Sequence, residues 1–143
     1  MKSILALALI LGSAAASAMP SDQTCKGITA NGQVLRYVYS HDNCTGCEGD
    51  QAGTISNERI EIYLGEKLIT WFTDKQISTR INPDFQDSSF LEASNGRATF
   101  SMFIPEQDPD APLEGRLTVR VKSIKDPSKL AIKATNIAIK CDQ

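Results

Sequence analysis

Three residues at an even spacing carry the most versatile chemistry in the chain: His41, Cys44 and Cys47, in the pattern His-x-x-Cys-x-x-Cys. Imidazole and thiolate are ligands that suit Zn²⁺ or Cu⁺, so one interpretation of the three side chains is a metal site. Asp42 or Asp50 is near enough in sequence to supply a fourth ligand. A second Cys-x-x-Cys, which a zinc ribbon requires, is missing from the sequence, and this weakens the metal interpretation.

A second interpretation has Cys44 and Cys47 cycling between dithiol and disulfide. Redox-active pairs of this spacing place the first cysteine at a helix N-terminus, which lowers the pKa of its thiol. Here Glu48 and Asp50 follow, whose negative charges raise the pKa of a thiol, and no helical pattern begins there. The interpretation we favour is a structural disulfide between Cys44 and Cys47, within a polar loop over residues 41–51.

The other two cysteines, Cys25 and Cys141, stand near the two ends of the mature chain. Four cysteines in an exported protein are typical of two disulfides, and three pairings exist. We favour Cys25 with Cys141 and Cys44 with Cys47, because the termini of compact domains often lie close together.

The first 18 residues predict a signal peptide. Lys2 precedes an apolar run over residues 4–11, and the small residues Ala16, Ser17 and Ala18 then form a cleavage signal. The apolar run is far shorter than the roughly 20 residues that a membrane-spanning helix needs. We therefore expect residues 19–143 to form a single β domain, secreted or periplasmic, with no membrane span in the mature chain.

Composition sets limits on the class of protein. The chain has 143 residues, 41% of them hydrophobic and 22% charged, which fits one folded domain and excludes a disordered chain. Its formal charge is only -2, so we expect no nucleic acid as a partner. The last quarter, residues 115–143, is locally basic.

Short strand patterns separated by turn signals indicate an all-β fold. Asn31-Gly32 and Asn95-Gly96 are signals for type I′ turns, and Gly65-Glu66 for a type II′ turn. A four-residue turn over residues 125–128 joins the last two strand patterns, and residues 76–81 form an extra strand pattern. We predict an antiparallel β-sandwich or small closed barrel of about eight strands, built from hairpins and stapled by disulfides.

The turns also predict which residues face each other. The Gly65-Glu66 turn pairs Leu64 with Lys67, Tyr63 with Leu68, Ile62 with Ile69 and Ile60 with Trp71. Trp71 and Tyr63 are then the large anchors of this hairpin. The Asn95-Gly96 turn predicts three cross-strand pairs: Ala93 with Ala98, Leu91 with Phe100, and Ser89 with Met102. We expect Leu91, Phe100 and Met102 to lie in the core.

Two irregular segments are also predicted. The alternation of apolar residues changes phase after Ala134, which predicts a β-bulge near Thr135 and Asn136. The proline-rich and acidic segment over residues 105–113 reads as a long crossover loop.

One strand pattern is charged on a whole face. Arg116, Arg120 and Lys122 alternate with apolar residues, and Lys133 joins them across the last hairpin. These four residues form the one candidate surface for a polyanion. The competing interpretation is that exposed charges on a strand face or edge prevent aggregation, and we found no aromatic residue interleaved with the bases for stacking.

These patterns favour a non-enzymatic exported domain with a binding or structural role, for a protein or small-molecule partner. His41 is the one histidine, no phosphate loop or nucleophile elbow occurs, and we expect no cofactor. The alternative is a small redox or metal-binding protein that uses the His41-x-x-Cys44-x-x-Cys47 segment. Within the binding class, a ligand carrier is a further alternative, with a barrel interior lined by four aromatic residues: Tyr37, Tyr39, Trp71 and Phe103.

Overall fold

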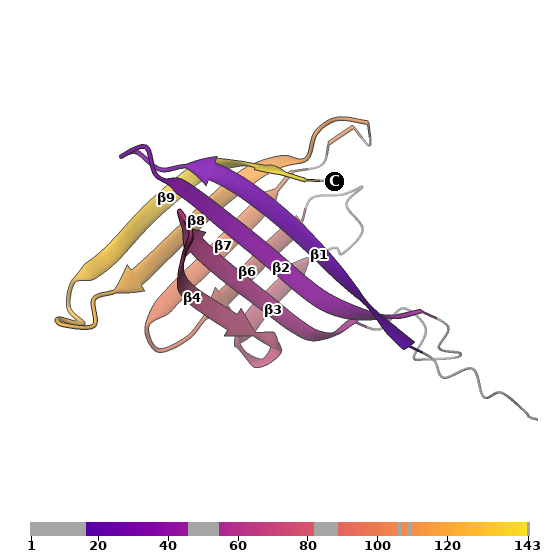
Figure 1. The fold of residues 1–143 in the computed structure, drawn as a ribbon, viewed down its shortest axis with the longest axis horizontal. Helices are drawn as coiled ribbons and strands as arrows, with labels where there is room; N and C mark the ends of the chain where they lie inside the picture. Colours follow the sequence, from indigo (N-terminus) through magenta and orange to yellow (C-terminus); the bar gives the residue numbers. More distant parts are fainter. Residues whose placement is uncertain (1–16, 46–54, 82–88, 106, 109, 143) are drawn as a thin grey trace, which may run out of the picture.

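The computed structural model describes residues 17–45, 55–81, 89–105, 107–108 and 110–142. In these ranges the chain is almost all strand, with one short 3-10 turn, η2 (Asp74–Gln76), and no helix long and apolar enough to cross a membrane. The strands, drawn in Figure 1, are β1 (Ser17–Ile28), β2 (Val34–Thr45), β3 (Ile55–Leu64), β4 (Lys67–Thr73), β5 (Ile77–Ile81), β6 (Ser89–Ser94), β7 (Ala98–Ile104), β8 (Glu114–Lys122) and β9 (Leu130–Cys141).

All nine strands belong to one antiparallel sheet in the order β4-β3-β2-β1-β9-β8-β7-β6-β5. Strands adjacent in sequence are neighbours in the sheet except at β4 and β5, which are its two edges and are joined through η2. Pairing of the first strand with the last curls the sheet into a nearly closed barrel (Figure 1). This settles the choice between sandwich and barrel, and the predicted extra strand at residues 76–81 is β5.

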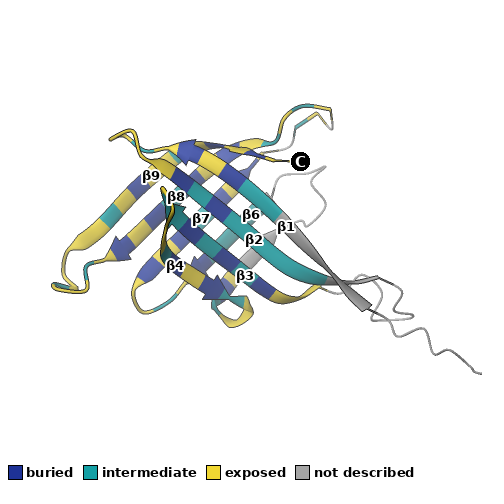
Figure 2. Cartoon of the chain, viewed as in Figure 1, coloured by how far each residue is buried: buried dark blue, intermediate teal, exposed yellow. Residues whose placement is uncertain are grey.

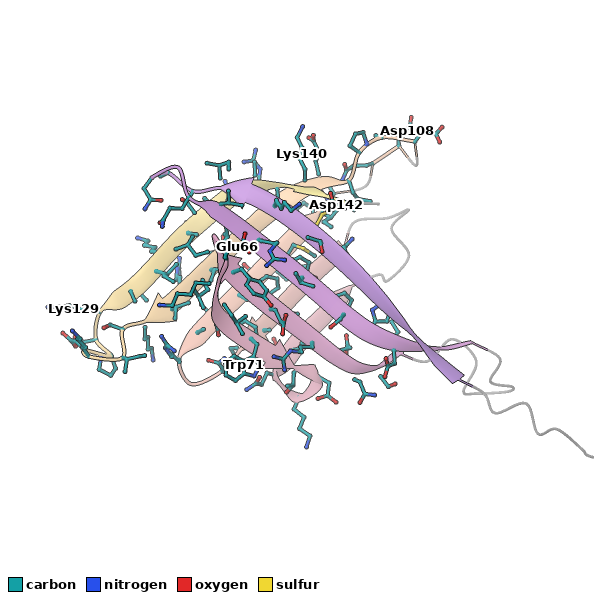
Figure 3. The ribbon with its side chains drawn as sticks, in the orientation of Figure 1. Glu66, Trp71, Asp108, Lys129, Lys140 and Asp142 are labelled. Carbon is teal, nitrogen blue, oxygen red and sulfur yellow. A yellow bond between two sulfur atoms is a disulfide. The ribbon has the colours of Figure 1, made fainter. Side chains whose placement is uncertain are left out.

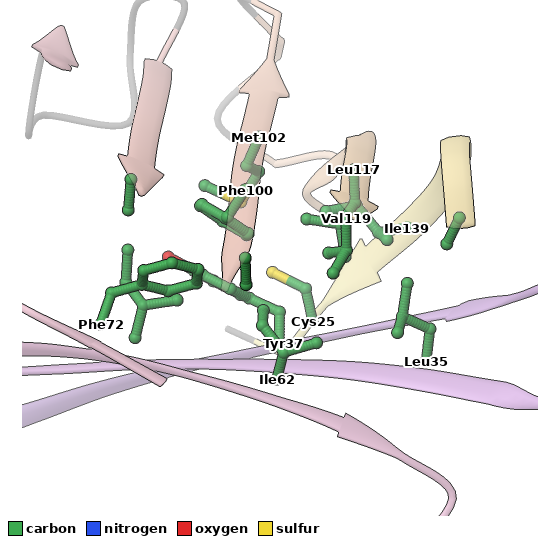
Figure 4. Close-up of a cluster of buried hydrophobic side chains, with 14 of the residues drawn as sticks. Cys25, Leu35, Tyr37, Ile62, Phe72, Phe100, Met102, Leu117, Val119 and Ile139 are labelled. Atoms are coloured by element: carbon green, nitrogen blue, oxygen red, sulfur yellow. The ribbon is translucent and has the colours of Figure 1, made fainter. Parts of the chain in front are cut away.

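Period-two alternation on each strand builds the core inside the sheet, and Figure 2 shows it as alternating buried and exposed bands. Two aromatic contacts join opposite walls: the Tyr37 and Phe100 rings stack with centroids 5.4 Å apart, and the Phe72 ring lies 6.0 Å from that of Phe100. Figure 4 shows this group with its neighbours. The largest fully buried side chains are Tyr37, Phe72, Leu35, Ile60, Ile62, Met102, Leu117, Ile139, Val119, Val121 and Cys25.

The predicted disulfide between Cys25 and Cys141 is confirmed, with the two Cα atoms 3.9 Å apart. Its two residues face each other in the ladder between β1 and β9, which also pairs Gly27 with Ile139. The disulfide therefore lies inside the sheet, where the first strand of the chain pairs with the last, and not at its edges, which are β4 and β5.

The hairpin at Asn31-Gly32 is where the sequence placed it, but its turn is of a different type. Gly32 has a positive φ of 78° and Asn31 does not, and the Gly32 amide donates to the Thr29 carbonyl over 2.9 Å. Thr29 also donates its amide to the Gln33 carbonyl, so the loop is a type I turn closed by a left-handed glycine. The predicted type I′ turn, with positive φ at both residues, is wrong.

The Gly65-Glu66 turn is confirmed in its first two pairs, Leu64 with Lys67 and Tyr63 with Leu68. A β-bulge between Ile62 and Tyr63 then shifts the register, so that Ile60 faces Phe72 instead of Trp71. Phe72 is consequently buried, while Trp71 points outward and is 51% exposed. The prediction that Trp71 is a core anchor is wrong, because a one-residue shift exchanges the two faces of a strand. Tyr63, the other predicted anchor, also lies on the outer face, where its hydroxyl donates to Glu61.

The hairpin at Asn95-Gly96 is displaced from its predicted register by two residues. Ala93 faces Phe100 and Leu91 faces Met102, because Gly96 and Arg97 form the turn. A shift of two residues preserves the face, so Phe100 and Met102 are buried as predicted. Leu91 is partly buried and packs against the same core.

The segment over residues 105–113 is a long hairpin loop and not the predicted crossover, since it joins β7 and β8, which pair directly. Gln107 supports the loop with two bonds to the Glu114 backbone, of 2.6 and 2.9 Å. The predicted bulge near Asn136 is confirmed: the register shifts between Leu117 and Val119, and Asn136 has a φ of 54°.

The edge strands β4 and β5 do not pair with each other, but the turn that follows β6 is hydrogen-bonded to β4. The Asn95 side-chain amide donates to the Trp71 carbonyl over 3.1 Å and lies 3.4 Å from the Thr70 hydroxyl. Its carbonyl oxygen meanwhile accepts from the amides of Arg97 and Ala98. One side chain therefore holds the turn and ties it to the edge of β4.

Candidate functional site

The inward face of β2 changes from apolar to polar along the strand. Leu35 and Tyr37 are fully buried in the core, whereas Tyr39 and His41, which follow on the same face, are partly exposed. On β3 the inward residues Ile62 and Ile60 are followed by Glu58, which is only 8% exposed. We call Tyr37, Tyr39, His41 and Glu58 the end cluster, because they are the inward polar residues that follow the apolar core toward one end of these two strands.

A β-bulge shapes the end cluster. Ser40 faces Arg59 while Asp42 faces Ser56, so His41 alone is opposite both Asn57 and Glu58. Asn57 adopts a left-handed φ of 52°, a conformation that asparagine tolerates better than most residues, and its side chain donates to Asp42 over 2.7 Å. The bulge places His41 and Glu58 at the same level of the interior.

Direct contacts join three of the four residues. The Tyr39 hydroxyl donates to Glu58 Oε1 over 2.7 Å. The rings of Tyr39 and His41 stack with centroids 5.0 Å apart and planes inclined by 27°. A buried carboxylate is costly unless it accepts hydrogen bonds, and the bond from Tyr39 contributes to offsetting that cost for Glu58.

Two polar atoms of the end cluster have no hydrogen-bond partner in the described part of the chain: the Tyr37 hydroxyl oxygen and His41 Nδ1. Both atoms are buried. Burial raises the pKa of Tyr37 well above its usual value, and the nearby Tyr39 and Glu58 add to the effect. Tyr37 therefore stays a neutral phenol with a hydroxyl available to donate to, or accept from, another molecule.

The sequence analysis placed His41 in a polar loop, and this is wrong, since β2 continues through residues 41–45. The Cys44 side chain and the whole of Cys47 lie outside the described residues, so their disulfide and the His41, Cys44 and Cys47 metal set remain predictions. Within the described ranges, no three His, Cys, Asp or Glu side chains lie together in a way that could hold a metal ion.

The basic residues lie where the sequence predicted. Arg116, Arg120, Lys122 and Lys133 are all exposed on the outer face of β8 and β9, and Arg120 is directly opposite Lys133 in the ladder. The structure corrects the expectation that no aromatic residue accompanies them. Phe103 faces Arg116 from the neighbouring β7 and is 42% exposed.

Of the four aromatic residues predicted to line the interior of a ligand carrier, two face the interior and two do not. Tyr37 and Tyr39 do face the interior, but Trp71 and Phe103 lie on the outer surface. At the level of Tyr37 the interior is filled by the stack with Phe100. A barrel of about eight strands is just wide enough for side chains to fill, and the core here follows that rule.

Aromatic and charged residues of β2, β3 and β4 form a group on the outer surface that the sequence did not predict. The Arg36 guanidinium lies 4.1 Å from the Tyr63 ring centre, and that of Arg59 lies 5.8 Å from the Trp71 ring centre. Glu61 accepts from both Arg59 and Tyr63 over 2.7 Å. The sequence did not predict this group, because the bulge at Ile62 and Tyr63, which turns Trp71 outward, cannot be recognised from the pattern of apolar and polar residues.

Comparison of the chain with protein-family models, with curated proteins and with solved structures finds no match. The function is therefore argued from the site alone.

Proposed function

We propose that this chain is an exported, non-enzymatic binding protein that holds the polar group of a small molecule at the end cluster. Export is supported by the leader-like first 18 residues, together with the disulfide that joins β1 to β9. A β scaffold that ends in a polar layer of inward side chains is a common arrangement for a ligand site.

The observation that carries the proposal is the Tyr37 hydroxyl, which has no hydrogen-bond partner among the described residues. A buried hydroxyl without a hydrogen bond costs about 1–3 kcal/mol, so native proteins rarely keep one without a reason. Tyr39, the next inward residue of β2, donates its hydroxyl to Glu58. The Tyr37 hydroxyl and His41 Nδ1, by contrast, are buried and have no hydrogen-bond partner among the described residues. A ligand that presents hydrogen-bonding groups to the Tyr37 hydroxyl and to His41 Nδ1 would satisfy both atoms.

The same geometry favours binding over catalysis. His41 is the one histidine of the chain, and its ring stacks on Tyr39. A general base needs its imidazole nitrogen bonded to a nucleophile or a substrate proton. Nδ1 has no nucleophile within hydrogen-bonding distance among the described residues.

Replacement of Tyr37 by Phe tests the proposal, since it removes the hydroxyl and keeps the stack on Phe100. We expect Tyr37→Phe to fold with unchanged or slightly higher thermal stability, because one unsatisfied buried group is lost. A panel of small polar molecules, screened by the shift of the melting temperature, should contain compounds that stabilise the natural protein and not the variant.

Tyr63→Phe is the matched control, because that hydroxyl bonds to Glu61 on the outer surface. It should keep the full response to every compound that stabilises the natural protein. A Tyr37→Phe variant that loses 1 kcal/mol or more of stability, with no compound separating it from the natural protein, would show a structural hydroxyl and overturn the proposal.

A further inference from the structure

The outer surface of β8 and β9 carries a group of bases that nothing in the end cluster uses. We call Arg97, Arg116, Arg120, Lys122 and Lys133 the basic face; all five are exposed. No carboxylate of the described chain forms an ion pair with any of them. The chain as a whole has a formal charge of -2, so this is a local excess of positive charge against an acidic background.

Protection against aggregation does not account for these charges. Lysine and arginine guard a sheet most usefully at its edge strands, where unpaired backbone groups invite another strand. Here the edges are β4 and β5, whereas β8 is hydrogen-bonded on both sides, to β7 and to β9. The bases of β8 therefore lie on a strand that has no edge to protect.

The cross-strand pairs within one hairpin point to a ligand. Arg120 is directly opposite Lys133, an arrangement of like charges that destabilises a sheet. Further along the same two strands, Glu114 is opposite Lys140 and forms an ion pair with it over 3.1 Å. Figure 3 labels Lys140 at this paired end and Lys129 at the turn at the other end. The hairpin thus neutralises one base and leaves Arg120 and Lys133 for an anion from outside.

The bases form a track and not a single pocket. At about 3.4 Å per residue, Arg116 and Lys122 lie roughly 20 Å apart along β8. Arg116 Nη1 lies 3.5 Å from the Asn136 carbonyl and Arg97 Nε lies 3.3 Å from that of Lys122, which orients both guanidinium groups without neutralising them. We propose that the basic face binds a linear acidic polysaccharide, whose repeated carboxylate or sulfate groups match such a track.

A polysaccharide fits this surface better than a nucleic acid does. Proteins that bind single strands stack successive bases on several aromatic rings, whereas here Phe103 is the one exposed aromatic beside the described bases, facing Arg116. An acidic polysaccharide is also a polymer that an exported protein meets.

Heparin is the probe for the test, with binding measured by titration calorimetry at about 50 mM and about 200 mM salt on the full mature protein. The test variant is Arg120→Gln with Lys133→Gln. The matched control is Lys67→Gln with Lys75→Gln, which makes the same change in net charge on β4 and η2, away from the basic face. A single-stranded DNA of equal total charge serves as the competitor.

We expect heparin to bind natural protein and control alike, to bind more weakly at the higher salt, and to bind the test variant about tenfold more weakly. The test variant should melt at the same temperature or higher, since it relieves the Arg120–Lys133 repulsion. Three results would each overturn the proposal: no heparin binding, equal weakening in both variants, or tighter binding of the DNA than of heparin.

Discussion

Glu61 shows how much of the outer surface depends on one carboxylate. It accepts a hydrogen bond from Tyr63 and another from Arg59, whose guanidinium lies over the Trp71 ring. The bond from Tyr63 and the charge and bond from Arg59 lower the pKa of Glu61 below its usual value. The same bond, seen from its other end, raises the pKa of Tyr63.

The direction of the Glu61 shift fixes its pH dependence. A carboxyl whose pKa is lower in the folded protein stabilises it above the unfolded pKa, here 4.5, and loses that effect as the pH falls through the folded value. We expect Glu61→Gln to cost roughly 0.5 kcal/mol at pH 7, the size measured for exposed ion pairs. Urea denaturation of both proteins at pH 7 and near pH 3 checks this.

The two denaturation curves should converge at the acidic pH. A difference that persists undiminished near pH 3 would mean that the carboxamide disturbs packing around Trp71, and that the charge of Glu61 is unimportant.

At the scale of the elements, two glycines are where strands approach too closely for a side chain. A Cβ built on Gly115 would lie 2.5 Å from the Phe103 carbonyl oxygen, and one on Gly27 would lie 2.5 Å from that of Ala138. Both obstacles are backbone atoms of a paired neighbouring strand, which cannot move without breaking the ladder.

We therefore expect Gly115→Ala to destabilise the protein by about 2 kcal/mol, within the range of overpacked positions. Gly96→Ala is the control, since nothing lies within 4 Å of its Cβ position and its φ is not positive. It should change stability by less than about 0.5 kcal/mol. Guanidinium denaturation of the two variants compares them directly, and equal losses would contradict the close approach at Gly115.

The hairpins show which features of the elements the sequence reveals. Alternation and turn residues located the four hairpins with short turns, because the period of two and the glycine positions are local properties. They missed the hairpin between β7 and β8, whose long loop was predicted to be a crossover. The bulge at Asn136 was also readable, since a phase change in the apolar residues survives in the sequence. The bulge at Ile62 was not, because residues 68–72 are apolar or aromatic at nearly every position and allow either register.

The candidate site was recoverable only in part, for a related reason. The bases on β8 alternate with buried aliphatic residues, so their common face followed from the sequence alone. The end cluster did not, because it depends on the bulge at Asn57 that sets His41 beside Glu58. Long-range strand pairing, which decided that β8 is central and β4 is an edge, likewise has no local signal.

At the scale of the whole molecule, the shortest ladder of the sheet joins the first strand of the chain to the last. β1 and β9 pair only from Cys25 to Gly27 with Ile139 to Cys141, whereas β1 pairs with β2 along its whole length. The disulfide lies inside the short ladder and spans 116 residues of chain. A crosslink that closes so long a loop removes much conformational entropy from the unfolded chain.

We expect Cys25→Ser with Cys141→Ser to cost about 4 kcal/mol of unfolding free energy on the chain-entropy argument. Cys44→Ser with Cys47→Ser is the matched control, because a crosslink that close in sequence constrains the unfolded chain little, and its loss should lower stability by about 1 kcal/mol or less. Urea denaturation of the two double variants measures both costs. A large loss from the Cys44 and Cys47 pair, with a small one from Cys25 and Cys141, would mean that strand pairing alone holds β1 to β9 and that the fold depends on the Cys44 and Cys47 pair.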